Sequence, residues 1–322
     1  MSKHRKNSRR KVRINRSLIK FVQVLFLLFE LIGLPKHFSK YSNRLFDNWQ
    51  LFALLVLRAK ARCSIEDFLE QFLPSAQGLQ RALNLDKIPT ASAVRKFARR
   101  LKAIWGHGAL AGCAELAGLK DICAGIDGTG HSKQRGSRHF YRRVGKRSKK
   151  KDFLKIVGLD DLTSQLVLAL KIRKKTRHDN VDFKPTVNKT ARATSLDVVI
   201  ADKGFDAQKN HEVVHLHGAL LITPLKNKGV PIWRTKGEDR KRLKRYFPKK
   251  TYNQRSKKET VFGVVKQKFG DVVHAFVFHM QKIELLCRYL AYNVDRILSL
   301  QKKLKIVSQF SDELKKTLLG DV

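Results

Sequence analysis

Between residues 122 and 224, short apolar runs alternate with turns and helical stretches, and this alternation constrains the fold more than any other feature. The runs are Ile122–Thr129, Phe153–Leu159, Leu166–Ile172, Leu196–Asp202 and Ala219–Pro224. Each is too short for a typical buried helix and is therefore predicted to be a strand. Helical patterns near Val181–Ala191 and over Ala207–His217 separate the last three runs. The order predicts an α/β domain built on a sheet.

Two of these strands carry an aspartate that is followed by a glycine turn. Asp127 lies in the sequence I-D-G-T-G, and Asp202 begins the sequence D-K-G-F. An aspartate at such a position is commonly an N-cap or a turn former, which is the alternative for either residue alone. A shared functional site requires a further acidic group.

That acidic group lies in the stretch Tyr252–Lys266, which reads Y-N-Q-R-S-K-K-E-T-V-F-G-V-V-K. On a helix, at about 100° per residue, Arg255, Glu259 and Lys266 fall within roughly 40° of one another. Tyr252 falls within about 60° of them. The alternative is a solvated, lysine-rich helix that happens to carry one glutamate.

Asp127, Asp202 and Glu259 together are carboxylates from two strand ends and one helix. Divalent-metal phosphoryl-transfer sites are assembled in this way. Carboxylate oxygens are hard ligands that suit Mg²⁺ or Mn²⁺ rather than zinc. The sequence therefore predicts a metal site formed by these three side chains.

The same motifs carry a family resemblance. The Y-x-x-R spacing, with three intervening residues to E and six to K, resembles the signature of bacterial and archaeal insertion-sequence transposases of the four and five types, within the DDE superfamily. The I-D-G-T-G sequence is similar to that family's first acidic motif and D-K-G-F to its second. The resemblance covers roughly Leu119 to Leu300, including L-L-C-R-Y-L-A-Y-N at Leu285–Asn293. One mild departure from the family's first acidic motif is Gly128, at a position where serine is expected about as often as glycine.

The resemblance implies a ribonuclease H-like core with a mixed sheet, which the order of strands and helices also matches. Asp127 would lie on the central strand, Asp202 at the end of its neighbour and Glu259 on the covering helix. Two Mg²⁺ or Mn²⁺ ions would be held, one by the aspartates jointly and the second completed by Glu259. The expected chemistry is strand nicking by water, then attack of the freed 3′-hydroxyl on target DNA.

The cationic and aromatic residues of the same motif are expected to contact DNA. Arg255 and Lys266 would hold phosphates of the cleaved end, and Tyr252 would line the same groove. Trp233 lies between the last strand and this helix, where it could stack on a base drawn out of the duplex. The alternative for Trp233 is a buried side chain that pins this linker to the core.

The net charge of the chain also indicates DNA as its partner. The chain has 68 Lys and Arg against 27 Asp and Glu, with a formal net charge of +41 and a pI of about 10.5. Ribosomal and architectural proteins share this balance, but 322 residues with 43% hydrophobic content are enough for a sizeable core. The runs Lys133–Lys155 and Lys226–Lys258 hold eleven and fourteen basic residues. Cys63, Cys113, Cys123 and Cys287 form no zinc or disulfide pattern.

The N-terminal third is predicted to be helical after a disordered basic tail. Apolar Leu18–Leu34 is interrupted by polar residues, so we expect a packed helix rather than a signal peptide or membrane span. Residues 42–119 read as helices with turns near Pro74-Ser75, Asp86–Pro89 and Gly106-His107-Gly108. A capped helix after Thr90 carries Arg95 and Arg99. It could read DNA in a helix-turn-helix unit or simply present a basic outer face.

We therefore expect four parts: a basic tail at 1–16, a helical domain for DNA binding or dimerisation at 17–118, the catalytic core at 119–302 and a helical tail at 303–322. The predicted function is cleavage and strand transfer of an insertion sequence by a homodimer on paired ends of double-stranded DNA, with no membrane or small-molecule partner. The expected location is the cytoplasm and nucleoid of a prokaryotic cell. Alternatives are a nuclease that cuts without joining and a non-enzymatic DNA-binding protein derived from a transposase.

Overall fold

The computed structural model of the chain describes residues 2–42, 44–133, 143, 153–174 and 177–304, with side chains between residues 17 and 301. Most of the basic run Lys133–Lys155, and the predicted C-terminal tail beyond residue 304, lie outside the described residues.

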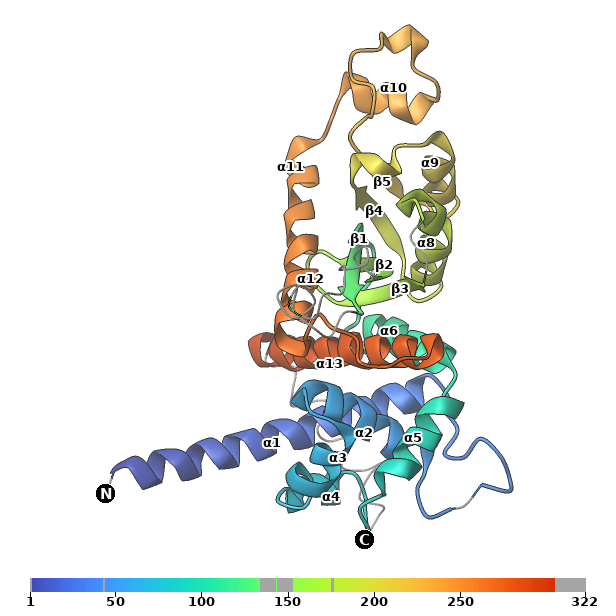
Figure 1. Cartoon of the computed structure of the whole chain (residues 1–322). Coiled ribbons are helices and arrows are strands. Elements are labelled where there is room, and N and C mark those ends of the chain that lie inside the picture. The colour runs from blue at the N-terminus through green and yellow to red at the C-terminus, as the bar shows by residue number, and fades with distance from the viewer. Residues whose placement is uncertain (1, 43, 134–142, 144–152, 175–176, 305–322) are drawn as a thin grey trace.

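Within the described residues, five strands form one mixed sheet at the centre of the molecule (Figure 1). They are β1 (Ile122–Ser132), β2 (Phe153–Asp161), β3 (Val167–Arg173), β4 (Leu196–Ala201) and β5 (Leu220–Ile222). Their order is β3-β2-β1-β4-β5. The β1–β2 and β2–β3 pairs are antiparallel, whereas β1–β4 and β4–β5 are parallel. This confirms the predicted strands and the ribonuclease H-like mixed sheet.

Helices cover both faces of the sheet (Figure 1). On one side lie α8 (Phe183–Ala191), which follows a 3-10 turn at Asp179–Asp182, and α9 (Gln208–His215). On the other side lies α12 (Ser256–Phe269), which contacts β1. The strands therefore contribute fully buried aliphatic side chains to the core, such as Ile126, Val157 and Val199.

The N-terminal third is helical, as predicted. Its helices are α1 (Ser2–Leu31), α2 (Asn48–Ala61), α3 (Ile65–Asp67), α4 (Gln77–Ala82), α5 (Ala91–Arg100) and α6 (Ala103–Leu116), with a π turn at Phe68–Phe72. Thr90 caps α5, because its Oγ1 accepts a hydrogen bond from the Ala93 N–H (3.2 Å). The long helix α13 (Phe278–Leu304) lies between the sheet and the helices α1 to α5, whereas α6 contacts both α13 and β3 (Figure 1). The buried side chains consequently form one continuous cluster.

Two predictions about the N-terminal third are wrong. The turn predicted at Gly106–Gly108 lies inside α6, because these glycines permit close packing of helices. A Cβ on Gly106 would lie 3.0 Å from the Leu286 side chain of α13. The disordered tail predicted at residues 1–16 is helical from Ser2 onward. The segment contains no proline or glycine, and Lys and Arg are good helix formers.

Between β5 and α12 the chain forms a basic projection, which we call the insert (residues 225–248). It includes a 3-10 turn at Ile232–Arg234 and the helix α10 (Glu238–Arg245), and it extends beyond the sheet on the side away from α13 (Figure 1). The carboxylate of Asp206 anchors it. Arg240 donates two hydrogen bonds to this carboxylate (2.7 and 3.0 Å), and the Lys226 N–H donates a third (2.9 Å).

None of the helices in the described part of the chain has the length and apolar character that crossing a membrane requires.

Candidate active site

The two predicted aspartates emerge side by side from parallel strands. Ile126 of β1 pairs with Ala201 of β4, and the next residues along the two strands are Asp127 and Asp202. Each aspartate uses one carboxylate oxygen in its own turn. The Gly128 and Lys203 N–H groups donate to the respective Oδ1 atoms at 2.7 Å. The turn-forming alternative therefore accounts for one oxygen of each aspartate and leaves the second oxygen for another partner.

The neighbouring carboxylate of Asp202 influences the pKa of Asp127. Burial raises the pKa of Asp127, and the neighbouring negative charge of Asp202 adds to the rise. The Gly128 N–H, Lys258 and Arg255 act in the opposite direction. A pair of carboxylates that repel each other in a partly buried place attracts a cation.

Glu259 reaches this site through Arg255. The short helix α11 (Lys249–Tyr252) continues through a 3-10 turn at Asn253–Arg255 into α12, so the predicted helix is nearly continuous. The Arg255 guanidinium donates a hydrogen bond to Glu259 Oε1 (2.9 Å), and its Nη1 lies 3.5 Å from Asp127 Oδ2. Arg255 therefore bridges the carboxylate on the helix and the carboxylate on the central strand.

Tyr252 belongs to the same group of side chains. Burial raises the pKa of its phenol, and the nearby charges of Asp202 and Asp127 add to the rise, whereas Arg255 lowers it. Its ring packs edge-on against Phe247, with ring centres 5.2 Å apart. The structure thus brings together Asp127, Asp202, Glu259, Arg255 and Tyr252.

This donor set fits a hard divalent cation by its chemistry. Carboxylate oxygens are the ligands that Mg²⁺ and Mn²⁺ prefer, and the repulsion between Asp127 and Asp202 would be relieved by a cation. As the side chains lie, however, the guanidinium of Arg255 supplies the counter-charge to Asp127 and Glu259. Among the described residues, no three His, Cys, Asp or Glu side chains converge closely enough to hold an ion together. Glu259 would have to exchange Arg255 for the ion.

The glycine at position 128 has a structural reason. A Cβ at Gly128 would lie 2.9 Å from Oδ2 of Asp179, whose carboxylate also contacts Lys155. Successive residues of a strand point to opposite faces, so Asp179 lies on the face opposite to the side chain of Asp127. No local pattern signals this contact, since Asp179 lies in the turn before α8.

Three other acidic residues that could have replaced the triad have structural partners. Asp160 forms an ion pair with Lys258. The Ser164 N–H donates to Asp161 (2.6 Å) in the turn after β2. Asp206 anchors the insert through Arg240. Each of the three carboxylates is therefore already engaged by a structural partner.

The conspicuous motif at Leu285–Asn293 holds the site's framework together from α13. Arg288 donates hydrogen bonds to the carbonyls of Gly270 (2.8 Å) and Val272 (2.7 Å), directly after α12. The Tyr289 hydroxyl contacts Nε2 of His131 at the end of β1 (3.1 Å). The Asn293 side chain hydrogen-bonds to both backbone groups of Val167, as a neighbouring strand would. The motif therefore fixes β1, β3 and the end of α12 to one helix.

Other predicted contact residues lie away from this group. Lys266 is about two helical turns beyond Glu259, and its ammonium pairs with Asp271 (3.5 Å). Trp233 is 73% exposed in the insert, with the Arg234 guanidinium 4.7 Å from its ring centre, so the alternative that it pins the linker to the core is wrong. On α5, Arg95 pairs with Glu66. Arg99 lines a groove of about 360 Å³ beside it.

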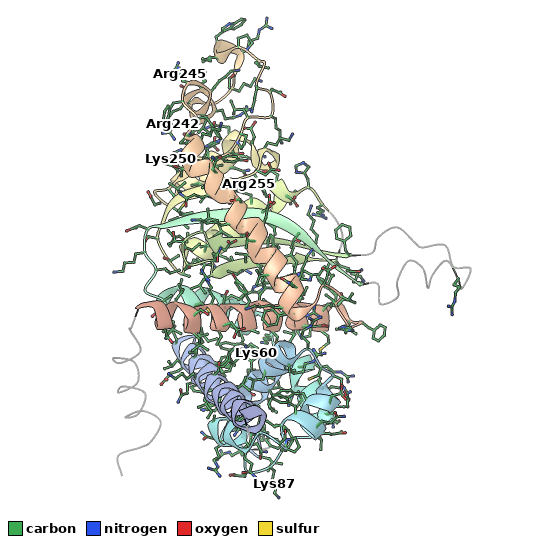
Figure 2. The ribbon with its side chains drawn as sticks, turned by 90° about the vertical axis from the view of Figure 1, so that its left-hand side faces the viewer. Lys60, Lys87, Arg242, Arg245, Lys250 and Arg255 are labelled. Carbon is green, nitrogen blue, oxygen red and sulfur yellow. The ribbon has the colours of Figure 1, made fainter. Side chains whose placement is uncertain are left out.

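Basic side chains continue from the site into the insert. In Figure 2, Arg255 lies at the start of α12, with Lys250, Arg242 and Arg245 following one another toward the tip of the insert. Arg242 and Arg245 are both on α10, where Leu243 is the buried residue. This side of the molecule therefore presents a cationic path that begins at the carboxylates.

The comparisons with known proteins agree with this geometry. A family model described as the transposase DDE domain matches residues 121–294, which is more than half of the chain. The matched range begins just before β1 and ends in α13, so it contains the whole sheet, the insert and α12. A search of curated proteins found no match.

Proposed function

We propose that this chain, which belongs to the transposase DDE domain family, cleaves DNA at the ends of an insertion sequence and joins the freed ends to target DNA. One observation carries the proposal. Asp127 and Asp202 leave adjacent parallel strands at the same level, and Arg255 links Glu259 to them from the covering helix. The surrounding chain has a net charge of +41, which suits a polyanionic substrate.

The carboxylates would hold two divalent ions, Mg²⁺ or Mn²⁺. When bound, such ions activate water or a 3′-hydroxyl and neutralise the charge that develops on the phosphate. Burial of Asp127 keeps this site partly screened from solvent, which strengthens its attraction for a cation. The protein itself contributes mainly positioning and charge neutralisation.

The cationic and aromatic residues would hold the DNA. Arg255, released from Glu259, would contact a phosphate of the cleaved end, and Tyr252 would line the groove beside it. Lys266, about two helical turns from Glu259 along α12, would contact the DNA backbone. Trp233 is exposed and could stack on a displaced base, whereas Arg95 and Arg99 would contact DNA from the N-terminal helices. Two copies of the chain would act on paired ends.

The test is the substitution Glu259→Gln, which keeps the size of the side chain and removes its charge. Purified variant and wild-type protein are incubated with end DNA and Mg²⁺, and cleaved and joined products are separated. We expect both products to fall by a factor of about 100 or more, since several kcal/mol of charge stabilisation are removed. Binding of end DNA should persist or tighten, because a negative group facing DNA is removed.

Glu212→Gln, an exposed and chemically identical change on α9, is the matched control and should leave both products unchanged. Normal joining by folded, DNA-bound Glu259→Gln protein would show that the triad is wrong. Cleavage without joined products in wild-type protein would identify a nuclease instead. Binding without any cleavage would identify a DNA-binding protein that has lost its chemistry.

A further inference from the structure

Lys258, the residue directly before Glu259, is completely buried. Its side chain has no exposed surface, although it lies on a helix whose neighbouring residues Lys257 and Glu259 are exposed. Lysine is almost never fully buried unless it is paired, because removing its charge from water costs several kcal/mol. Such a side chain requires a specific reason.

The partner of Lys258 is Asp160 on β2, which is equally inaccessible to solvent. The Lys258 ammonium contacts the Asp160 carboxylate and lies 4.0 Å from the centre of the Phe262 ring, one turn along α12. The ion pair therefore joins the covering helix to the sheet inside an apolar environment.

The sheet approaches this lysine closely. Asp160 lies opposite Gly125 of β1, where a Cβ would lie 2.7 Å from the Leu162 side chain and 3.4 Å from Cβ of Lys258. The next such pair along these strands is Asp127 opposite Gly158, where a Cβ would lie 3.3 Å from the Phe262 ring. Residues two apart on a strand share a face, so Asp160, Asp127 and α12 are on the same side of the sheet.

The ion pair restricts α12 in a way that its apolar contacts do not. Val261, Phe262 and Val265 are buried, but hydrophobic burial is non-directional and tolerates sliding or rotation of a helix. Rotating or shifting α12 would separate Lys258 from Asp160 and leave two unpaired charges in an apolar place. Since adjacent residues of a helix point about 100° apart, holding Lys258 toward the sheet also sets the direction of Glu259.

We propose that the Lys258–Asp160 ion pair is a positioning device that fixes the register and rotation of α12 so that Glu259 faces Asp127. Lys258 and Asp160 are positioning residues, since the ion pair acts through Glu259. A contribution to stability alone does not explain the pair, because well-packed apolar residues of similar volume are often as stable or more stable at such sites. The role of the ion pair in catalysis rests on the proposed function. Its effect on the position of α12 does not depend on that function.

The test replaces both charges at once, with the double variant Lys258→Met and Asp160→Leu, which avoids leaving one buried charge unpaired. We expect it to fold and to melt at or above the wild-type temperature. Cleavage of end DNA should slow about tenfold or more, as misplacement of a reacting group by about 1 Å is enough to do. The dissociation constant for end DNA should stay within about twofold. Lys209→Met, an exposed lysine on α9, is the matched control.

A measurement of position separates this inference from the proposed function. Spin labels at Thr260→Cys on α12 and Glu212→Cys on α9 report the distance from helix to core, in a background where Cys63 and Cys123 are serine. We expect one narrow distance distribution with the ion pair intact, and a broadened or shifted one in the double variant, by up to the roughly 5 Å of one helical turn. An unchanged narrow distribution would overturn the proposal, even if wild-type protein did not cleave DNA. Wild-type cleavage rates in the double variant would also overturn it.

Discussion

The helix α12, which covers the acidic face of the sheet, and the insert above it are both built from basic sequence, but they are held in different ways. On α12, Val261, Phe262, Val265 and Phe269 are buried, and even Lys258 is enclosed. On α10, Leu243 is the buried residue. The insert is attached at its base by polar contacts, chiefly from Asp206 to Arg240 and from Asp239 to His215 (2.8 Å).

This difference matches what each region is proposed to do. Carboxylates that hold an ion must keep their relative positions to within a fraction of an ångström. Cations that contact phosphates act through counterion release, which depends on their number more than on exact placement. A rigid acidic face and a lightly attached basic projection can therefore serve one reaction.

The largest effect is expected from breaking the attachment of the insert. Asp206→Asn removes the charge that pairs with Arg240, in a carboxylate with no exposed surface. Loss of one partner of a buried ion pair costs about 3–5 kcal/mol. The cost should fall on the insert, so trypsin cleavage within residues 226–250 should accelerate by roughly 100-fold or more, whereas the main unfolding transition should move little.

Asp197→Asn, an exposed aspartate on β4, is the matched control and should leave the proteolysis rate unchanged. If Asp206→Asn instead lowered the main melting transition and left the insert resistant, the two regions would be one cooperative unit. The contrast between a rigid face and a lightly attached insert would then be wrong.

A second prediction concerns the rigid face and its dependence on pH. His131 has no exposed side-chain surface and joins β1 to Tyr289 of α13. Burial lowers its pKa to about 4, and although Asp271 opposes this, the folded state holds the imidazole neutral. The unfolded chain takes up a proton near pH 6.5. Stability from this residue is therefore complete above that pH and is lost as the pH falls toward 4, by up to about 3 kcal/mol.

His131→Asn can still form hydrogen bonds but does not titrate. We expect the unfolding free energy of this variant, measured by urea denaturation between pH 4 and 7, to fall less steeply with decreasing pH than that of the wild type. His178→Asn, at an exposed position, should keep the wild-type slope. Identical slopes for all three proteins would mean that protonation of His131 does not loosen the acidic face.

Local sequence patterns predicted the strands and the flanking helices, and with the family resemblance they led to the three carboxylates proposed for the site. Strand length, the glycines after Asp127 and Asp202, and the cap at Thr90 are determined by neighbouring residues, so a single sequence reveals them. Composition alone was misleading for residues 2–16, where helix propensity outweighed charge. At Gly106, glycine serves packing against Leu286 rather than a turn, which no local pattern distinguishes.

The contacts that position the site were not predictable in this way. Lys258 with Asp160 and His131 with Tyr289 are pairs separated by about 100 residues or more, and neither member carries a local signature. The exposure of Trp233 depends on how the insert projects from the sheet. Sequence therefore revealed which residues could do chemistry, whereas the tertiary fold determined which of them meet.

A third, smaller effect is expected at Trp233 in the insert. Trp233→Ala should leave the melting temperature unchanged, because the indole is 73% exposed. Binding of intact end DNA should stay within about twofold. Strand processing should fall roughly tenfold if the ring stacks on a displaced base, since one such stack is worth about 1–3 kcal/mol. Ile232→Ala, an adjacent exposed apolar change, is the control. Fluorescence of a base analogue at the end would detect directly whether the base is still displaced.

The smallest effect is expected at the opposite end of the molecule, and it tests whether basic charge outside the insert acts in the same loosely constrained way. Residues 1–16 carry eight Lys and Arg and no acid. Deleting them should weaken binding to any DNA and reduce the slope of log affinity against log salt by about 0.9 for each phosphate that is no longer neutralised. Discrimination between end DNA and random DNA should not change, because phosphate contacts carry no sequence information. Binding measured at several salt concentrations, with both DNAs, separates these effects.

A reduced preference for end DNA would show that α1 reads bases, and an unchanged slope would show that its charges do not reach the phosphates. Either result would mean that the non-specific contribution of basic side chains to DNA affinity comes from the insert and its neighbours.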